Sequence, residues 1–370
     1  PRQRDLPQFR QLPRLPASPS DSVTKSNMAA NDKIIITREN GEQIEAQAPV
    51  IVSASRSTDI PGFYCDWFLH RLRVGYSVWT NPFNGVRSYV SYRNTRLIVF
   101  WSKNPQHLID KNGLIDFLQE KGINSYVQFT LNDYVEEKLE RGVPSVETRI
   151  ATFKALVGKL GFGKVIWRFD PLILTDKIGV DDLLRKVKNI GNQLKGYTEK
   201  LVFSFADITA YKRVKANMEH NNINYREFTV ADMIQFASGL QELNKTWGYT
   251  LATCGEKIDI EKYGIVHNKC VDDDLMIKYF SDDARLMDYL GVEIQDANLF
   301  SGERTIIKKK NNKDKGQRQF CGCIASKDIG EYNTCAHLCE YCYANSSKEA
   351  ALRNLQTHRQ NPFAETIIGK

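Results

Sequence analysis

The sequence predicts an α/β protein, a partial (β/α)6–7 barrel of the TIM type. Two observations predict it. Short apolar runs rich in β-branched and aromatic residues recur between residues 50 and 253, with little alternation of apolar and polar positions. Such runs are expected of parallel strands covered on both faces. Amphipathic stretches with helical spacing lie between them, and this alternation is typical of a (β/α) barrel or a doubly wound sheet.

Each element has its own signal. The predicted strands are 50–55, 97–101, 125–131, 164–169, 200–205 and 248–253. The predicted helices are 62–74, 145–160, 180–194 and 231–247. Asp59 and Pro61 mark the start of the first helix, and Ser145 marks the start of the second. Six strands are fewer than the eight of a closed barrel, so the barrel is predicted to be partial.

The flanking segments differ from this body, which we place at residues 49–260. Residues 1–27 contain five prolines and no apolar period, which predicts a disordered leader or a cloning remnant before a natural start at Met28. Residues 28–48 contain KIIIT, the turn signal ENGE and QIEAQ, which predict a hairpin appendage. Residues 261–325 are predicted to be helical over 271–291 and then basic, and 326–370 to form a strand, a loop and a helix.

Composition narrows the class of protein. The chain has 370 residues, of which 42% are hydrophobic and 26% charged, and its net charge is +7. Part of that charge lies in residues 1–27, so the total does not by itself indicate a nucleic-acid-binding protein. Residues 304–318 are strongly basic, and we interpret them as a solvated loop or a contact to phosphate. No apolar run of about 18 residues occurs, so we expect a cytoplasmic protein without a membrane span.

The cysteines carry the strongest signal. They are Cys65, Cys254, Cys270, Cys321, Cys323, Cys335, Cys339 and Cys342. A chain of this length does not need disulfides, and clustered cysteines in a cytosolic protein indicate metal ligands. Cys335, Cys339 and Cys342 form a C-x3-C-x2-C pattern, with Tyr341 directly before the third cysteine. Such thiolates suit three corners of a [4Fe–4S] cluster, and together with His337 they also suit zinc.

The pattern resembles the signature of the radical S-adenosylmethionine (SAM) superfamily. More of the chain resembles an uncharacterised bacterial family of unknown function with this motif at its C-terminus, distantly similar to enzymes of the spore photoproduct lyase type. The matching segments are SASRSTDIP at 53–61, NPFN at 81–84, FWSKNP at 100–105, QFTL at 128–131, WRFDP at 167–171, TCGEKID at 253–259 and the C-terminal cysteine block.

The position of the motif departs from that superfamily, in which the three cysteines follow the first barrel strand. Here they come last. We therefore expect a circular permutation, in which residues 326–357 supply a strand, the cluster loop and a helix beside the strand at 50–55.

The resemblance implies a function. The open iron of the cluster would bind SAM, and reduction by a donor such as flavodoxin or ferredoxin would release a 5′-deoxyadenosyl radical that abstracts hydrogen from a substrate. Polar residues at the predicted strand ends are candidates for contacting SAM: Arg56, Asp59, Gln128, Arg168, Asp170 and Tyr341. The alternative is structural, with Asp59 capping a helix and Arg168 pairing with Asp170.

A second metal site is predicted from the remaining cysteines. Cys254 and Cys270 form one pair and the C-x-C residues Cys321 and Cys323 the other. Four thiolates suit a second [4Fe–4S] cluster or an all-thiolate zinc site, and a packed core thiol is the alternative for Cys254. We interpret Cys65 as a core residue.

Three functions remain open. The leading one is a radical SAM-type enzyme with an unknown substrate, which the basic stretch suggests is phosphorylated or a nucleic acid. The second is a zinc-stabilised, non-enzymatic nucleic-acid-binding protein. The third is a barrel hydrolase that uses Asp170 and Glu256 as acid and base.

Overall fold

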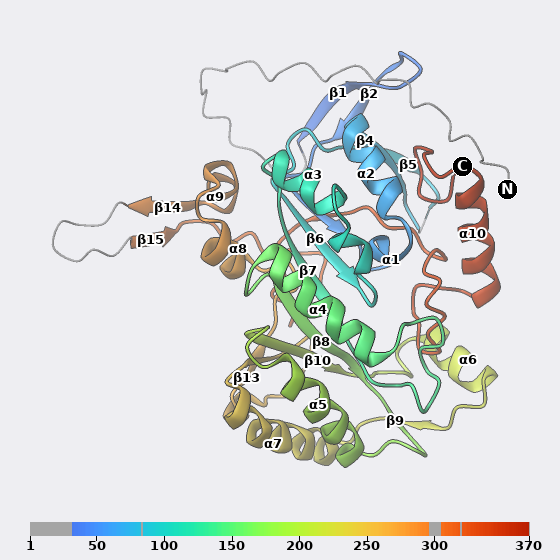
Figure 1. Cartoon of the computed structure of the whole chain (residues 1–370), viewed down its shortest axis with the longest axis vertical. Coiled ribbons are helices and arrows are strands. Elements are labelled where there is room, and N and C mark those ends of the chain that lie inside the picture. The colour runs from blue at the N-terminus through green and yellow to red at the C-terminus, as the bar shows by residue number, and fades with distance from the viewer. Residues whose placement is uncertain (1–31, 83, 296–304, 319, 370) are drawn as a thin grey trace, which may run out of the picture.

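An eight-stranded, all-parallel sheet flanked by helices forms the centre of the molecule (Figure 1). The structure is a computed structural model that describes residues 32–82, 84–295, 305–318 and 320–369. The leader predicted at residues 1–27 lies outside these residues. The strands in spatial order are β13 (Ile265–His267), β12 (Thr250–Thr253), β10 (Lys200–Phe205), β8 (Val165–Leu172), β7 (Asn124–Thr130), β6 (Leu97–Ser102), β3 (Ile51–Ala54) and β16 (Lys327–Asp328). The predicted α/β class and all six predicted strands are confirmed.

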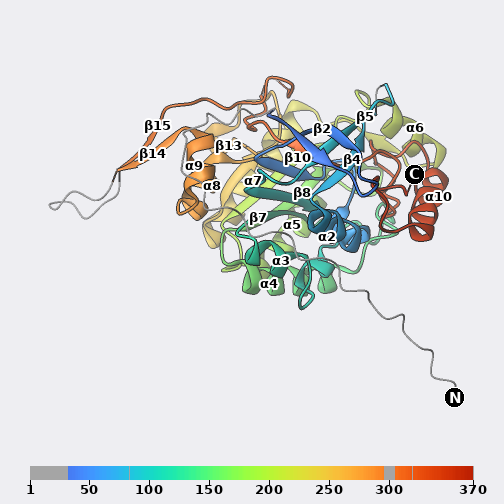
Figure 2. The ribbon, with the colours of Figure 1, turned by 90° about the horizontal axis from the view of Figure 1, so that it is seen from above.

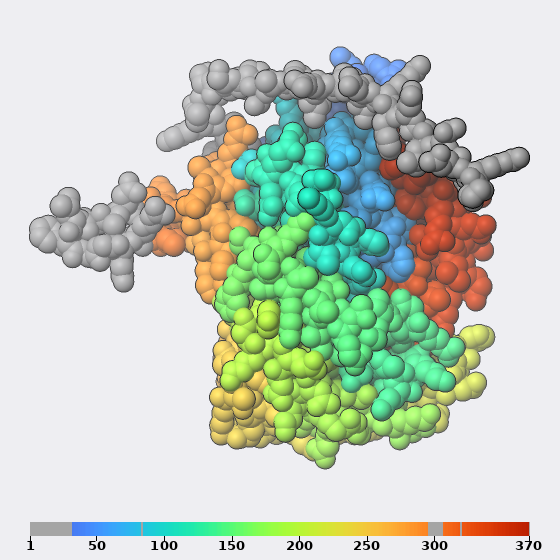
Figure 3. Space-filling view, in the orientation of Figure 1, coloured from blue at the N-terminus to red at the C-terminus, as the bar shows by residue number. Residues whose placement is uncertain are grey.

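The C-terminal segment enters this sheet at the edge next to β3. Lys327 and Asp328 of β16 pair in parallel register with Val52 and Ser53. The predicted insertion of a strand from residues 326–357 beside the strand at 50–55 is therefore confirmed. In the space-filling view, the C-terminal segment packs along the N-terminal part of the body (Figure 3).

One face of the sheet is covered by helices from the middle of the chain. They are α1 (Ile60–Phe63), α2 (Cys65–Val74), α3 (Leu114–Glu120), α4 (Val146–Leu160), α5 (Val180–Leu194) and α7 (Val230–Trp247). Helix α6 (Lys212–His220) lies beside the C-terminal segment instead (Figure 2). The helix expected at 62–74 is two helices, because the backbone leaves helical geometry at Tyr64. The Oγ atom of Ser145 accepts the Thr148 N–H at 3.2 Å, which starts α4 as predicted.

Shorter elements complete the fold. The hairpin predicted at 28–48 forms as β1 (Lys33–Thr37) and β2 (Gln43–Gln47), but it joins β5 (Arg87–Ser91) and β4 (Tyr76–Thr80) in a four-stranded sheet. The helical stretch predicted at 271–291 is two helices, α8 (Asp273–Phe280) and α9 (Ala284–Leu290). The remaining elements are β9 (Leu174–Thr175), β11 (Tyr225–Arg226), β14 (Val292–Gln295), β15 (Thr305–Lys308) and α10 (Lys348–Gln360), with short 3-10 turns at Gln106–Ile109 and Glu261–Tyr263.

Alternation along the strands divides the interior into two cores. Ile98 and Phe100 pack into the core under α2–α5 and α7. Leu97 and Val99 point to the opposite face, into a smaller core with α8 and α9. That second core contains Cys270, Cys321 and Cys323, so this face of the sheet is filled by the segment that carries three of the remaining cysteines. Figure 2 shows α8 and α9 beside one end of the sheet.

Among the described residues, no helix has the length and apolar character needed to cross a membrane.

Candidate metal centres

The cysteine loop, defined here as residues 335–342, follows β16 and lies over the carboxyl ends of the neighbouring strands. Parallel strands end at the same edge, so residues after β3, β6 and β7 meet the loop there. Just before the loop, the Oγ1 atoms of Thr58 and Thr334 are 2.7 Å apart. Farther along the loop, the hydroxyl of Tyr341 accepts a hydrogen bond from Lys103 Nζ at 3.0 Å. The loop is therefore held by the strand ends on which sequence reasoning placed an active site.

The three thiols of the loop are free and largely enclosed. Burial raises the pKa of Cys335, Cys339 and Cys342, so the metal-free thiols are protonated and metal binding would displace their protons. No three cysteine sulfurs of the described chain lie within 4.8 Å of one another. One zinc ion holds its sulfur ligands roughly 3.8 Å apart, whereas a cluster uses a separate iron for each thiolate. The metal-free thiols of the loop would therefore have to move closer together to share one zinc ion.

The imidazole of His337 is committed to other partners. Its Nε2 lies 2.6 Å from an Asp59 carboxylate oxygen, and its Nδ1 lies 3.1 Å from the carbonyl oxygen of Gly142. The residue at 142 must be glycine, because a Cβ there would lie 2.7 Å from the carbonyl oxygen of Ala336. With both ring nitrogens engaged, His337 anchors the loop, which argues against a zinc site of three cysteines and this histidine.

Asp59 connects the cysteine loop to the segments that follow β3 and β6. Its carboxylate also accepts the backbone N–H groups of Gly62, at 2.8 Å, and Lys103, at 2.8 Å. Burial pushes the pKa of Asp59 up, but His337 outweighs burial and the pKa is lowered. The expected capping alternative for Asp59 is thus present, and its contact with SAM stays a prediction.

A buried polar network supports Tyr341. Its hydroxyl donates to Glu140, which also accepts Lys103 Nζ at 2.7 Å and Asn132 Nδ2 at 3.0 Å. Burial raises the pKa of Glu140, but Lys103 and Arg149 outweigh it and bring the pKa to about 2. Glu140 is therefore a buried carboxylate whose charge is balanced by these two cations, and the network fixes the aromatic ring directly before Cys342.

The four cysteines predicted as a second site do come together, and we call them the four-cysteine cluster. The Sγ atoms of Cys254 and Cys270 are 3.5 Å apart. Cys323 accepts the backbone N–H of Cys270 at 3.1 Å, and its thiol interacts with those of Cys270 and Cys321. In chain order, Cys254 follows β12, Cys270 follows β13, and Cys321 and Cys323 lie in the segment before β16. Four thiols gathered in a core are a donor set that fits a metal centre with four thiolate ligands.

Two guanidinium groups face this cluster. Arg168 Nη1 donates to the Cys270 sulfur at 3.1 Å and to the Gln128 Oε1 at 3.1 Å. Hydrogen bonds from Cys254 and Cys323, followed by the charges of Arg168 and Arg56, lower the pKa of Cys270 against the cost of burial. A metal centre with four thiolates carries net negative charge, and these two cations oppose it.

Arg56 lies between the two sites. The Tyr343 hydroxyl, one residue beyond Cys342, donates to the Arg56 carbonyl oxygen at 2.6 Å. The Arg56 guanidinium stacks 5.0 Å above the Trp101 ring, and its buried Nη2 has no hydrogen-bond partner in the described chain. The charge of its side chain acts on Cys270 and Cys323 of the four-cysteine cluster, while its backbone contacts the residue after the cysteine loop.

The predicted SAM contacts thus divide between two places. Asp59 and Tyr341 lie at the cysteine loop, whereas Gln128 and Arg168 lie at the four-cysteine cluster. Arg168 and Asp170 form the ion pair expected as the structural alternative, and Ser204 donates to Asp170 as well. No contact in the structure tests whether any of these residues binds SAM.

Sequence reasoning missed several site residues. Asn132 directly follows the predicted strand at 125–131, and its position at a strand end could have identified it. Glu140 has no local signal, because it lies in the connection before α4 and reaches the site only through tertiary contacts. Asp328 accepts the Arg56 N–H at 3.0 Å from the edge strand β16, which follows only once that strand is placed beside β3.

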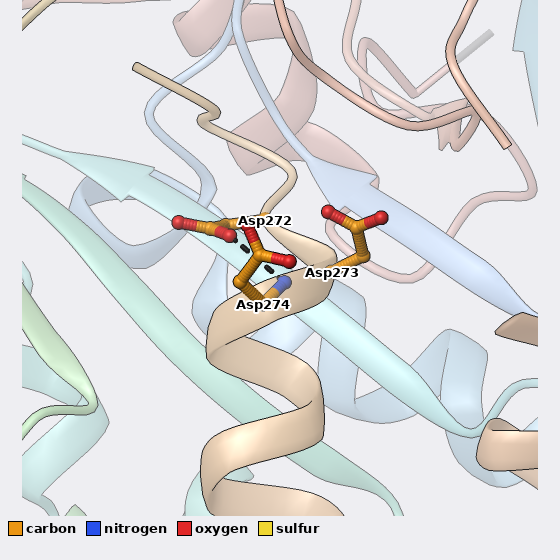
Figure 4. A group of neighbouring side chains, drawn as sticks. All are labelled: Asp272, Asp273 and Asp274. Carbon is orange, nitrogen blue, oxygen red and sulfur yellow. Dashed lines mark hydrogen bonds between the residues drawn. The ribbon is translucent and has the colours of Figure 1, made fainter. Parts of the chain in front are cut away.

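Three neighbouring aspartates have another explanation than metal binding (Figure 4). Asp272, Asp273 and Asp274 bring carboxylate oxygens within 4.8 Å of one another. Asp272 caps α8 by accepting the Asp274 and Leu275 N–H groups at 3.0 and 3.2 Å. Lys269 pairs with the other two at 2.7 and 2.6 Å. Capping and ion pairing account for this group.

The fold and these sites define a class: α/β proteins with a parallel sheet and sets of free thiols at the carboxyl ends of its strands. Within that class, the chain belongs to the family described as Domain of unknown function (DUF1848), whose model matches residues 51–344. No curated protein and no solved structure matches the chain. The match to an uncharacterised family agrees with that part of the resemblance drawn from the sequence.

Proposed function

We propose that this protein is a radical SAM-type enzyme. Cys335, Cys339 and Cys342 would hold a [4Fe–4S] cluster, and its open iron would bind SAM. The observation that carries the proposal is the position of the cysteine loop: it follows β16, next to β3, and lies over the strand ends. That is where a permuted form of a partial (β/α) barrel would have its cluster loop.

The chemistry would come from the bound groups. When bound, the cluster and SAM supply a 5′-deoxyadenosyl radical after one electron from a donor such as flavodoxin or ferredoxin breaks the carbon–sulfur bond and leaves methionine. The chain holds and orients them. The Asp59–His337 pair anchors the loop, and the network of Lys103, Glu140 and Tyr341 fixes the loop before Cys342.

The four-cysteine cluster would hold a second [4Fe–4S] cluster. Its support is the convergence of four free thiols with Arg56 and Arg168, which would balance the negative charge of the centre. The metal-free sulfurs interact in a row, so the side chains would have to close around the metal. Zinc is the competing occupant of this site.

Iron content tests the proposal. Protein purified without oxygen is expected to be brown and to contain about eight irons per chain if both sites hold clusters. Replacing Cys335, Cys339 and Cys342 by alanine should remove four of them and abolish the formation of 5′-deoxyadenosine from SAM. Cys65→Ala is the matched control, since Cys65 is a free, half-buried cysteine on α2.

Other outcomes would reject the proposal. A colourless protein with stoichiometric zinc would support the zinc-stabilised nucleic-acid-binding protein instead. Activity that needs neither SAM nor reductant would support the hydrolase. Loss of iron in Cys65→Ala to the same extent as in the triple variant would show that the irons are not bound where we place them.

A further inference from the structure

A groove opens beside the cysteine loop, between α6, the turn joining β4 to β5, and the segment that leads into the loop. Its volume is about 650 Å³, which is in the range of sites for small organic ligands. Tyr211, Tyr332 and Tyr343 line it together with Lys212 and Arg213. We call it the tyrosine groove.

Aromatic rings provide its stacking surface. The Tyr211 and Tyr343 rings lie 6.2 Å apart between centroids, at 47°, which leaves no room for another ring between them. Tyr343 keeps 43% of its surface exposed. Its hydroxyl bond to the Arg56 carbonyl oxygen holds the ring in place before any ligand arrives. A rigid, exposed ring binds a planar group at low entropic cost.

Cations lie around these rings. The Arg213 guanidinium is 5.7 Å from the Tyr332 centroid, and that of Arg318, at the end of the basic stretch, is 5.5 Å from the Tyr211 centroid. Within the described ranges, Lys212, Arg213 and Arg318 form no ion pair with a carboxylate. The lining contains one acidic residue, Glu331. Two cations, Lys212 and Arg213, against this one carboxylate leave the lining of the groove with a net positive charge.

The groove adjoins the proposed cluster. Tyr343 directly follows Cys342, and Asn217 of α6 donates to the Cys342 carbonyl oxygen at 3.3 Å. A ligand stacked on Tyr343 would thus lie next to the loop that carries the proposed chemistry.

We infer that the tyrosine groove binds a nucleotide: a planar base on the exposed face of Tyr343, with its phosphate on Lys212 and Arg213. Stacked aromatic rings combined with unpaired cations recognise this chemistry, whether it comes as a free nucleotide or as one unit of a single strand. The inference rests on the proposed function only in naming a substrate class for that enzyme. Binding itself requires neither cluster nor reaction.

Calorimetric titration of the anaerobically purified full chain tests it. Adenosine 5′-monophosphate is expected to bind, and adenosine and ribose 5-phosphate to bind at least about tenfold more weakly, because each lacks one of the two recognised groups. Arg213→Ala should weaken binding of the monophosphate by about tenfold. Lys215→Ala is the control, since Lys215 is an exposed cation on the same helix that pairs with Glu219. It should leave affinity within twofold.

A fluorescein-labelled dT12 strand distinguishes the two sources. Tighter binding of the strand than of the monophosphate, weakened by Arg213→Ala and by salt, would identify a nucleic-acid strand as the source. Equal or tighter binding of the monophosphate would identify a free nucleotide.

The inference fails if neither probe binds, if adenosine binds as well as its monophosphate, or if Arg213→Ala changes nothing. It also fails if SAM displaces the monophosphate and loses affinity in Arg213→Ala, which would make the groove the SAM site. Iron content, measured on the same samples, reports separately on the proposed function.

Discussion

The cysteine loop and the four-cysteine cluster gather thiols in opposite ways. The loop takes three cysteines from eight consecutive residues and holds them from outside, through Asp59–His337 and the network around Glu140. The four-cysteine cluster draws its thiols from three separated parts of the chain, and the sulfurs contact one another. Cysteines close in sequence are already near one another and need contacts with other side chains only to fix their orientation. Cysteines far apart in sequence come together only when the protein folds.

The charges beside the two sites differ as well. At the loop, the single carboxylate of Glu140 faces two cations, Lys103 at 2.7 Å and Arg149 at 3.7 Å, and within the described residues neither cation donates a hydrogen bond to a cysteine sulfur. At the four-cysteine cluster, Arg168 donates directly to a sulfur, and the Arg56 Nη2 has no partner in the described chain. Arg168 is also paired with Asp170, but a cation that donates directly to a sulfur stabilises an anionic centre, so the second site is the one whose charge state a neighbouring cation controls more directly.

The largest effect is expected from removing the charge of the loop network. Glu140→Gln leaves Lys103 and Arg149 buried without their carboxylate, which should lower the free energy of unfolding by about 3 kcal/mol. Urea denaturation measures this. Glu136→Gln, an exposed carboxylate in the same connection, should change stability by less than about 0.5 kcal/mol. If both variants were equally stable, the network would not be the anchor of the loop.

The charge difference can be tested at Arg168. If both clusters form, Arg168→Met should lower the midpoint potential of the second one by on the order of 50 mV, because the reduced, more negative state loses a nearby cation. The potential of the SAM-binding cluster should stay unchanged in the same redox titration followed by electron paramagnetic resonance. Arg168→Lys keeps the charge, so the midpoint potential of its second cluster should stay close to that of the unmodified protein. Equal shifts at both clusters would contradict the assignment of Arg168 to the four-cysteine cluster.

The same contrast explains what could be predicted from sequence. The cysteine loop is a local pattern, and strand periodicity is local too, so the motif and all six strands were found. The four-cysteine cluster was predicted only by counting the cysteines left over, since nothing near Cys254 indicates that Cys323 lies beside Cys270.

The network around Tyr341 was out of reach for a related reason. Lys103 follows the predicted strand at 97–101, so its place at a strand end could be predicted, whereas Glu140 lies in a connection and does not stand out from its sequence neighbours. Their pairing depends on how the loop after β7 crosses the strand ends. The missed strands β4 and β5 likewise are short; they pair with each other, and β5 joins them to the first hairpin by pairing with β2. Features that arise from contacts between distant segments have no periodic signal to read.

The smallest effect concerns the edge strand that delivers the cysteine loop. Burial lowers the pKa of Lys327 on β16 to about 8, although its Nζ lies 3.6 Å from the centroid of the Trp79 ring. Because the folded pKa is below the ordinary value of 10.5, the unfolded chain binds more protons between these two values. The free energy of unfolding should therefore rise as pH increases from 8 to about 10.5, and the charged lysine should cost stability throughout the range below pH 8.

Lys327→Met should accordingly raise stability at pH 7 by about 1 kcal/mol, a value kept small by the cation–π contact and partial solvation. That advantage should shrink as pH approaches 10, which thermal unfolding at several pH values measures. A gain that stayed constant with pH would arise from packing rather than from the charge of Lys327, and a loss would show that the contact with Trp79 outweighs burial at the strand that positions the loop.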